Sequence, residues 1–348
     1  MSPARRSALV APSTAHAPPP PAVRPEASDY EIFSSRVLHV PQRRFEVQTP
    51  ASAWLRAHQA SAALSCRDWE GFRDPRATTH ASYSELQRAR DGSLDRQLAS
   101  VEVSDCDSRL SAAWLGVLDG VLGPLRYPVH GLQMLASYIG ALAPSGPLVI
   151  AGLLQSADET RRVERLAQRL CQLQQVDPSC GSRSRDTWQR EPGWQPMREL
   201  IEQLLVVYRW GEAFVAVNVV LKPAFDELFM LDLGRLAQAA GDEVLERMLI
   251  SLYQDCAWHR QWSAALIAML VQDDPANAAT MAGWVERWKP RTDGAIDAVI
   301  AMLQRMLAAS EPERAAAVRV SLDQFMTGYW ASLGFALTGE TAASEDAP

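Results

Sequence analysis

Cysteine is sparse in this 348-residue chain, which has five, and no two are spaced as CxxC. This count and spacing favour neither a disulfide framework nor a zinc knuckle. Glycine-rich phosphate loops of the GxGxxG or P-loop type are missing, and so is a GxSxG nucleophile motif. The sequence therefore offers no recognisable motif for nucleotide binding, serine hydrolysis or structural zinc.

Basic charge and long apolar runs are also limited. Lys and Arg number 34 against 41 Asp and Glu, and no dense basic run occurs, which argues against nucleic-acid binding. The uncharged stretch 127–157 is broken at Pro144-Ser145-Gly146-Pro147, so each half is shorter than the ~20 apolar residues that a bilayer requires. We expect two buried helices there, no membrane span and no targeting signal, and we expect a cytoplasmic protein.

Helical periodicity dominates the chain from Tyr83 onward. No strand alternation of useful length occurs, and Gly-Pro or Pro-containing pairs such as Gly123-Pro124 and Lys289-Pro290 indicate helix ends. Asp274 before Pro275 is a typical helix start. The predicted helices are 83–104, 106–122, 125–142, 147–175, 195–231, 233–239, 242–270, 275–288, 292–308 and 312–337. The fold class is therefore all-α, with one helical domain over 83–340.

The two ends differ from this domain. Residues 1–28 are rich in Ala and Pro, and we expect them and the tail 341–348 to be disordered. Residues 29–82 carry scattered aromatic side chains but weak helical period. Such a segment is either an extended N-terminal arm that contacts a partner subunit or a loosely packed extension.

The stretch from Glu191 to Phe229 predicts one long helix, apolar on nearly every side in its second half. Glu212 and Asn218 lie among its Phe, Val and Leu residues. A helix that is apolar all round must be buried, and a buried carboxylate is costly unless it is paired or bound to metal. Four-helix bundles build di-iron carboxylate sites in this way, so the chain contains either such a site or only its scaffold.

Histidine is too scarce for a complete site of that kind. A di-iron bundle takes Glu from each of two helices and Glu-x-x-His from each of two others, since i,i+3 spacing directs both side chains toward one ion. The residues three positions before the six histidines are Ser13, Arg36, Leu55, Ala77, Tyr127 and Cys256, none of them acidic. We therefore expect no metal ligand set and no catalytic residue in this chain.

Two near-matches to the ligand motif stand out. Glu159 has Arg162 where the imidazole belongs, and a guanidinium cannot ligate iron although it can pair with a buried carboxylate. Asp255 and His259 are spaced i,i+4 and could chelate a metal. The favoured interpretation is a partly buried, hydrogen-bonded histidine near an interface.

Glu212 has two interpretations as well. It is either a lone ligand or a buried acid paired with an Arg such as Arg162 or Arg209, and the pairing is favoured because no second imidazole is in reach. The predicted vestigial site positions are Glu159, Arg162, Glu212, Asp255 and His259.

Several motifs, in order along residues 29–308, resemble the β subunits of soluble bacterial di-iron monooxygenase hydroxylases. They are WEGFRDP at 69–75 followed by Tyr83, GPLRY at 123–127, HGLQM at 130–134, QSAD at 155–158, EPGW at 191–194, WGEAFVAVN through KP at 210–223, and GWVERWKP at 283–290. The resemblance is closest to the four-component toluene and alkene enzymes. The leader at 1–28 departs from the family pattern, and residues after about 310 match weakly.

The resemblance implies a ferritin-like helical bundle with additional helices, acting as a non-catalytic subunit. The di-iron centre would lie in a larger α subunit that hydroxylates or epoxidises aromatic or alkene hydrocarbons with O2 and NAD(P)H-derived electrons. A small γ subunit would complete an (αβγ)2 hydroxylase, in which the N-terminal arm reaches over α. An effector protein, a Rieske-type ferredoxin and a reductase would complete the system.

The side chains expected to have structural or interface roles are Trp69, Tyr83, Trp210, Phe214, Asn218 and Trp284. Without its partner, the chain is expected to aggregate, because a large apolar interface would face water. Two other functions stay open from the sequence. One is a self-contained ferritin-like oxidase using Glu159, Glu212, Asp255 and His259, and the other is a helical scaffold unrelated to oxygenases.

Overall fold

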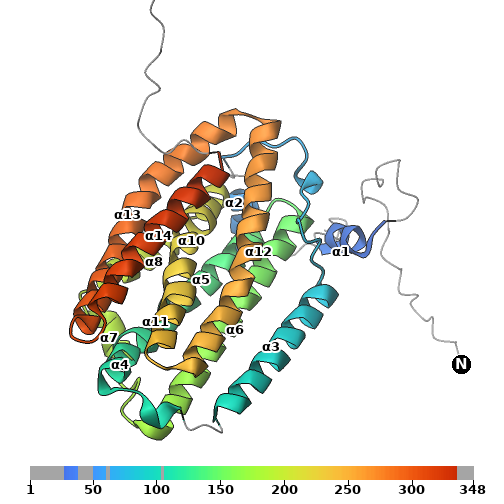
Figure 1. Ribbon diagram of the computed structural model, residues 1–348. Coiled ribbons are helices and arrows are strands. Elements are labelled where there is room, and N and C mark those ends of the chain that lie inside the picture. The colour runs from blue at the N-terminus through green and yellow to red at the C-terminus, as the bar shows by residue number, and fades with distance from the viewer. Residues whose placement is uncertain (1–26, 38–49, 60–62, 103–105, 335–348) are drawn as a thin grey trace, which may run out of the picture.

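The computed structural model describes residues 27–37, 50–59, 63–102 and 106–334, and within these ranges every regular element is helical (Figure 1). This confirms the predicted all-α class. All but two residues of the predicted leader at 1–28, and the whole predicted tail at 341–348, lie outside the described residues. Over the ranges that are described, no helix combines the length and the apolar composition that crossing a bilayer requires.

Long helices packed side by side form the body of the molecule (Figure 1). The principal ones are α5 (Gly123–Leu142), α6 (Gly146–Val176), α12 (Glu243–Asp273), α13 (Ala276–Leu307) and α14 (Pro312–Ser332). A further helix runs without interruption through α9 (Trp210–Phe214), η4 (Val215–Leu221), α10 (Lys222–Asp226), η5 (Glu227–Asp232) and α11 (Leu233–Ala239), in which η4 and η5 are π-helical. Nearly all residues of this helix from Trp210 to Leu233 are buried, as its all-round apolar pattern predicts.

The predicted single helix 195–231 is wrong at its centre. Helix α8 (Gln195–Leu204) ends in a tight turn, in which the Val206 and Val207 amides donate to the carbonyls of Gln203 and Leu204. Arg209 is then extended, and a new helix begins at Trp210. The prediction of one helix relied on an apolar run that includes Leu205, Val206 and Tyr208. These three side chains face outward, so their apolar character does not require a buried helix.

Two predicted helix ends at proline are also wrong. Helix α4 (Ala112–Val117) continues through the π-helical segment η3 (Leu118–Leu122) into α5, past Gly123-Pro124. Pro124 has no amide to donate to the carbonyl of Gly120, and the indole Nε1 of Trp194 donates to that carbonyl instead, at 2.9 Å. Pro290 likewise lies inside α13. A helix can thus continue past a proline where a buried side chain donates to the carbonyl that the proline leaves without a backbone donor, or where a π turn precedes it.

The segment predicted as an extended arm contains helices α1 (Asp29–Val37) and α2 (Pro50–Gln59), the short η1 (Trp69–Gly71) and the start of α3 (His80–Glu102). Helix α1 packs on the start of α6: a Cβ on Gly146 would lie 2.0 Å from the Ser34 carbonyl. Tyr30 is buried, and its hydroxyl accepts a hydrogen bond from the Asp74 amide. The described part of the arm therefore folds onto its own chain, and its contact with a partner stays a prediction.

Candidate functional site

Charged side chains meet inside the bundle, between α6, α10 and α12. Eight acidic, basic, thiol and imidazole side chains lie close together there, and each is at most 2% exposed: Asp158, Glu159 and Arg162 on α6, Lys222 and Asp226 on α10, and Asp255, Cys256 and His259 on α12. Spacings of three or four residues bring the members on each helix to one face. The π-helical segments η4 and η5 flank Lys222 and Asp226, and such π turns are frequent at functional sites.

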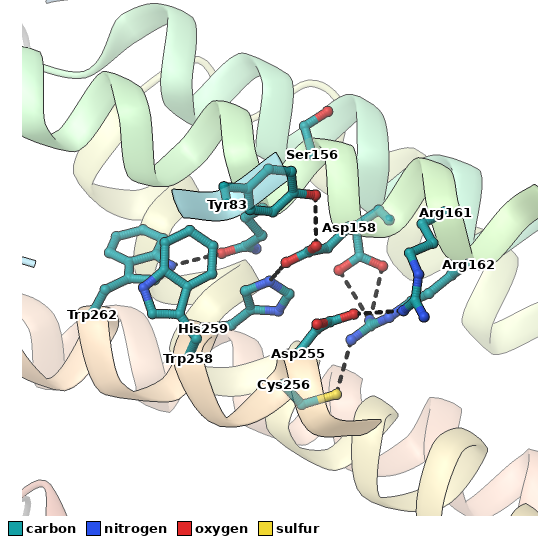
Figure 2. Close-up of polar contacts among 12 residues, drawn as sticks. Tyr83, Ser156, Asp158, Arg161, Arg162, Asp255, Cys256, Trp258, His259 and Trp262 are labelled. Atoms are coloured by element: carbon teal, nitrogen blue, oxygen red, sulfur yellow. Dashed lines mark hydrogen bonds and ion pairs between the residues drawn. The ribbon is translucent and has the colours of Figure 1, made fainter. Parts of the chain in front are cut away.

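Arg162 lies at the centre of the first group of contacts. Its Nη1 donates to both oxygens of Glu159, at 3.0 and 2.9 Å, and to Oδ1 of Asp226, at 2.9 Å. Its Nη2 donates to Sγ of Cys256 at 2.8 Å (Figure 2). The Lys222 ammonium lies 2.6 Å from Oε1 of Glu159 and 2.9 Å from Oδ2 of Asp226. We call Glu159, Arg162, Lys222 and Asp226 the buried ion cluster.

The charges in the buried ion cluster balance, and each supports the ionised state of its partners. Burial alone would raise the pKa of Asp226, but the Arg162 and Lys222 charges outweigh it and lower that pKa. Burial alone would lower the pKa values of Arg162 and Lys222, and the surrounding carboxylates raise them instead. Asp226, Arg162 and Lys222 are therefore charged at neutral pH. Burial raises the pKa of the Cys256 thiol, so this sulfur stays protonated.

A second network adjoins this cluster around Asp158. Its Oδ2 lies 2.8 Å from Nε2 of His259, and its Oδ1 accepts a hydrogen bond from the Tyr83 hydroxyl at 2.7 Å (Figure 2). The same Oδ1 accepts a second hydrogen bond from the Gln87 amide at 2.8 Å. Burial, aided by the Lys222 and Arg162 charges, lowers the pKa of His259 well below its ordinary value, so the imidazole is neutral. Its Nδ1 is buried and has no hydrogen-bond partner among the residues that the structure describes.

Asp255 is held by side chains other than His259. Its Oδ2 accepts from Nη1 of Arg161 at 2.9 Å (Figure 2). Its Oδ1 accepts from Gln87 and from Arg90. Asp255 and His259 thus contact different side chains. His259 is hydrogen-bonded, as predicted, but it is fully buried in the core instead of partly buried near an interface. Its structural role stays a prediction.

These residues do not fit a di-iron centre. The motifs Asp158-Glu159-x-x-Arg162 on α6 and Asp255-Cys256-x-x-His259 on α12 have the i,i+3 spacing of the two Glu-x-x-His motifs of such a bundle but not their residues. One imidazole is replaced by a guanidinium and one carboxylate by a thiol. Two cations, Arg162 and Lys222, lie among the remaining donors. No three His, Cys, Asp or Glu side chains in the described part of the chain are arranged to hold a metal ion.

Glu212 lies in a different environment from this group. Its Oε1 accepts from Nη1 of Arg287 at 2.8 Å and from Nε1 of Trp288 at 3.1 Å, both on α13. The carboxylate is paired, as predicted, but with Arg287 instead of Arg162 or Arg209. Glu212 therefore belongs with a structural tie between α9 and α13.

The predicted structural residues are mostly core residues. Trp210 and Phe214 stack at 5.8 Å between ring centroids, and Asn218 exchanges two 3.0 Å hydrogen bonds with the Gln155 amide. These three are buried in the core of their own chain, which favours the structural role over the interface role. Trp284 is also buried. Trp69 is half-buried and packs edge-on against Trp210, at 5.7 Å between centroids. Tyr83 binds Asp158, as described above.

Lys222, Asp226 and Asp158 were missed from the sequence. The signal was available for the first two, since Lys222 and Asp226 are spaced i,i+4 in the same all-round apolar helix that drew attention to Glu212. The role of Asp158 depends on which face of α6 meets α12, and spacing within one helix does not reveal that.

Comparisons with known proteins agree with the geometry. A family model described as Methane/Phenol/Alkene Hydroxylase matches residues 49–274. The β subunit of the hydroxylase component of the toluene-4-monooxygenase system from Ectopseudomonas mendocina is 31% identical over 309 residues, which cover 86% of this chain and 94% of that protein. The small subunit of the propane 2-monooxygenase hydroxylase component from Gordonia sp. (strain TY-5) is 24% identical, over 64% of this chain and 62% of that protein.

Solved structures show the same likeness. A chain in the structure of toluene 4-monooxygenase with toluene bound in its resting active site superimposes with a TM-score of 0.75 and 30% identity, over 81% of this chain and 94% of that chain. A chain of the xenon-pressurised phenol hydroxylase from Pseudomonas sp. OX1 gives a TM-score of 0.73 at 19% identity, over 87% of this chain and 90% of that chain, which bears on the fold alone. These matches confirm the predicted ferritin-like helical fold.

Proposed function

This chain belongs to the methane, phenol and alkene hydroxylase family, and we propose that it braces a di-iron hydroxylase without holding iron itself. It is a structural β subunit of a hydrocarbon monooxygenase hydroxylase, as the toluene, phenol and propane relatives support. The observation that carries the iron-free assignment is Arg162, whose guanidinium stands in a ligand position and contacts Glu159, Asp226 and Cys256.

The chemistry then belongs to a larger subunit that carries the di-iron centre. That centre would activate O2 for hydroxylation or epoxidation of an aromatic or alkene hydrocarbon, with electrons from NAD(P)H. The contribution of this chain is mechanical: a closely packed bundle with fixed polar ties gives the ligand-bearing helices of the partner a rigid support. We propose an (αβγ)2 hydroxylase in the cytoplasm, served by an effector protein, a ferredoxin and a reductase.

An exposed aromatic and apolar patch supports a partner contact. Trp54 of α2 packs against Tyr138 and Tyr208, at 6.3 and 5.7 Å between ring centroids. Tyr138 is half-buried, and exposed apolar side chains adjoin these rings in sequence: Met134 one turn before Tyr138, and Leu205 and Val206 just before Tyr208. We call Trp54, Met134, Tyr138, Leu205, Val206 and Tyr208 the patch. Exposed apolar surface of this kind indicates an interaction site, and α2 belongs to the arm that the family resemblance directs toward the large subunit. We therefore propose that the patch binds the large subunit.

A co-purification experiment tests the patch. Val206→Asp should reduce recovery of this chain with a tagged large subunit by at least tenfold, because the carboxylate would be desolvated in the interface. Val320→Asp on α14 is the matched control, since Val206 and Val320 are 59% and 56% exposed. Equal recovery of both variants would reject the patch as the contact site.

Metal analysis tests the iron-free assignment. Native mass spectrometry of the purified hydroxylase can eject this chain and weigh it separately. The expected mass is that of the polypeptide alone, with iron retained by the large subunit. A chain that carries about two irons after dialysis would instead support the self-contained oxidase. The geometry does not favour that alternative, because Glu212 pairs with Arg287 and Asp255 pairs with Arg161.

A further inference from the structure

We infer that Arg162 and Lys222 take the place of metal ions, so that the bundle keeps a ligand-like shell filled by the chain's own cations. The inference rests on the proposed function in one respect, because it takes this chain to be free of iron. It adds that the place of the metal ions is filled by positively charged side chains of the chain itself.

The arrangement of charge is the first support. Each of the two carboxylates, Glu159 and Asp226, contacts both cations. The four groups come from two helices, α6 and α10, and the Arg162 guanidinium also contacts Cys256 on the third, α12. The cations therefore join three helices of the bundle at one point, which is what a shared metal centre does in a di-iron bundle.

The second support lies outside the cluster, around His259. A histidine that binds a metal almost always donates its other ring N–H to a carboxylate or carbonyl. His259 has this arrangement: Nε2 lies 2.8 Å from Asp158, and Nδ1 is buried with no hydrogen-bond partner in the described part of the chain. The supporting shell of a metal-binding histidine is thus present, and the ring nitrogen that would bind the metal is unused.

The consequence is a latent cation site. Glu159, Asp226 and Cys256 surround the Arg162 nitrogens at 2.8–3.0 Å, whereas ligand distances to a Zn²⁺-like ion are about 2.0–2.3 Å. Removing both cations would leave two uncompensated buried carboxylates, which strongly favours uptake of a divalent cation. With its native cations, the chain should instead fold and assemble independently of iron supply.

The test uses the assembled hydroxylase with R162H/K222M in this chain. The substitution at position 162 completes a Glu-x-x-His motif with Glu159, and the one at 222 removes the second charge. After incubation with Co²⁺, the ejected variant chain should carry one Co²⁺, and the wild-type chain none. Adding C256S should abolish the thiolate-to-Co²⁺ charge-transfer absorption, and adding D158N should weaken binding about 10–100-fold.

The outcomes separate the two claims. A variant chain that assembles but is ejected without Co²⁺ overturns the inference and leaves the proposed function intact. A wild-type chain that is ejected with iron overturns the proposed function. Should the variant fail to assemble in metal-free medium, Zn²⁺ in the growth medium should restore assembly at least tenfold. Failure to assemble with and without Zn²⁺ also overturns the inference.

Discussion

Neutralising Arg162 alone should loosen α6 far more than neutralising Arg162 and Glu159 together. Arg162→Met leaves Glu159 and Asp226 with only the Lys222 charge, so one buried negative charge is uncompensated. Removing one member of a buried pair costs about 3–5 kcal/mol. Glu159→Gln with Arg162→Met removes one charge of each sign and keeps the Lys222–Asp226 pair, at 2.9 Å.

Hydrogen exchange of peptides from α6, measured in the assembled hydroxylase, reports this local stability. Since 1.36 kcal/mol corresponds to a factor of ten, Arg162→Met should accelerate exchange roughly 150- to 5000-fold. The double variant should exchange at least tenfold more slowly than Arg162→Met. Arg165→Met, one turn further along α6, is the control: its partners Asp91 and Asp95 are 36% and 57% exposed, so it should cost about 1 kcal/mol or less. The reasoning is refuted if the double variant exchanges as fast as Arg162→Met.

Three further predictions concern pH, packing and the Asp158 network. The pKa of Asp226 is lowered in the folded protein, so this group stabilises the fold above pH 3.8, and the stabilisation is lost as pH falls through the lower folded pKa. The pKa of Lys222 is raised, so this group stabilises the fold below pH 10.5, and the stabilisation is lost as pH rises through the higher folded pKa. In Arg162→Met the uncompensated carboxylate has a raised pKa and takes up a proton as pH falls, so the exchange difference from wild type should shrink as pH falls from about 9 to 5, and a constant difference over that range would contradict the charge assignment. Gly152→Ala should lower the melting temperature and cost about 1–3 kcal/mol, because the new Cβ would lie 2.6 Å from Cα of Gly140. The control Gly283→Ala, whose Cβ would meet no atom within 4 Å, should be neutral or stabilising. Equal melting temperatures of the two variants would contradict the close α5–α6 contact. Tyr83→Phe removes a 2.7 Å hydrogen bond to Asp158 and should cost about 1.5–3 kcal/mol, seen as faster exchange at the start of α3, and unchanged exchange would show that the bond contributes little.

The sequence was sufficient for the fold class and for the missing ligand motif, because both depend on spacing along one helix. The pairing of Arg162 with a buried carboxylate and the hydrogen bonding of His259 were expected from the same spacing, whereas the full burial of His259 was not. Lys222 and Asp226 were not recognised although they lie in the same apolar helix as Glu212. The partner of Glu212 was predicted wrongly, because Arg287 is 75 residues away in sequence.

Helix boundaries were less predictable where tertiary contacts override local signals. Pro124 reads as a helix end, yet the Trp194 indole satisfies the carbonyl that Pro124 cannot reach. Conversely, the turn before Trp210 lies in an apolar run, and its apolar side chains face outward into the patch that includes Val206 and Tyr208. A pattern within one segment indicates burial, but it does not reveal whether a partner subunit provides that burial.

The two π-helical segments η4 and η5 set the rotational phase of the helix that runs from Trp210 to Ala239. Each residue of an α-helix turns the chain by about 100°, so losing one residue from η4 would rotate everything after it by that angle relative to Glu212. Glu212 could then still reach α13 while Lys222 and Asp226 pointed away from α6. The wide π turns thus let Glu212, at the start of this helix, contact α13, while Asp226, near its middle, contacts Arg162. A uniform α-helix of this sequence would not orient both side chains in this way.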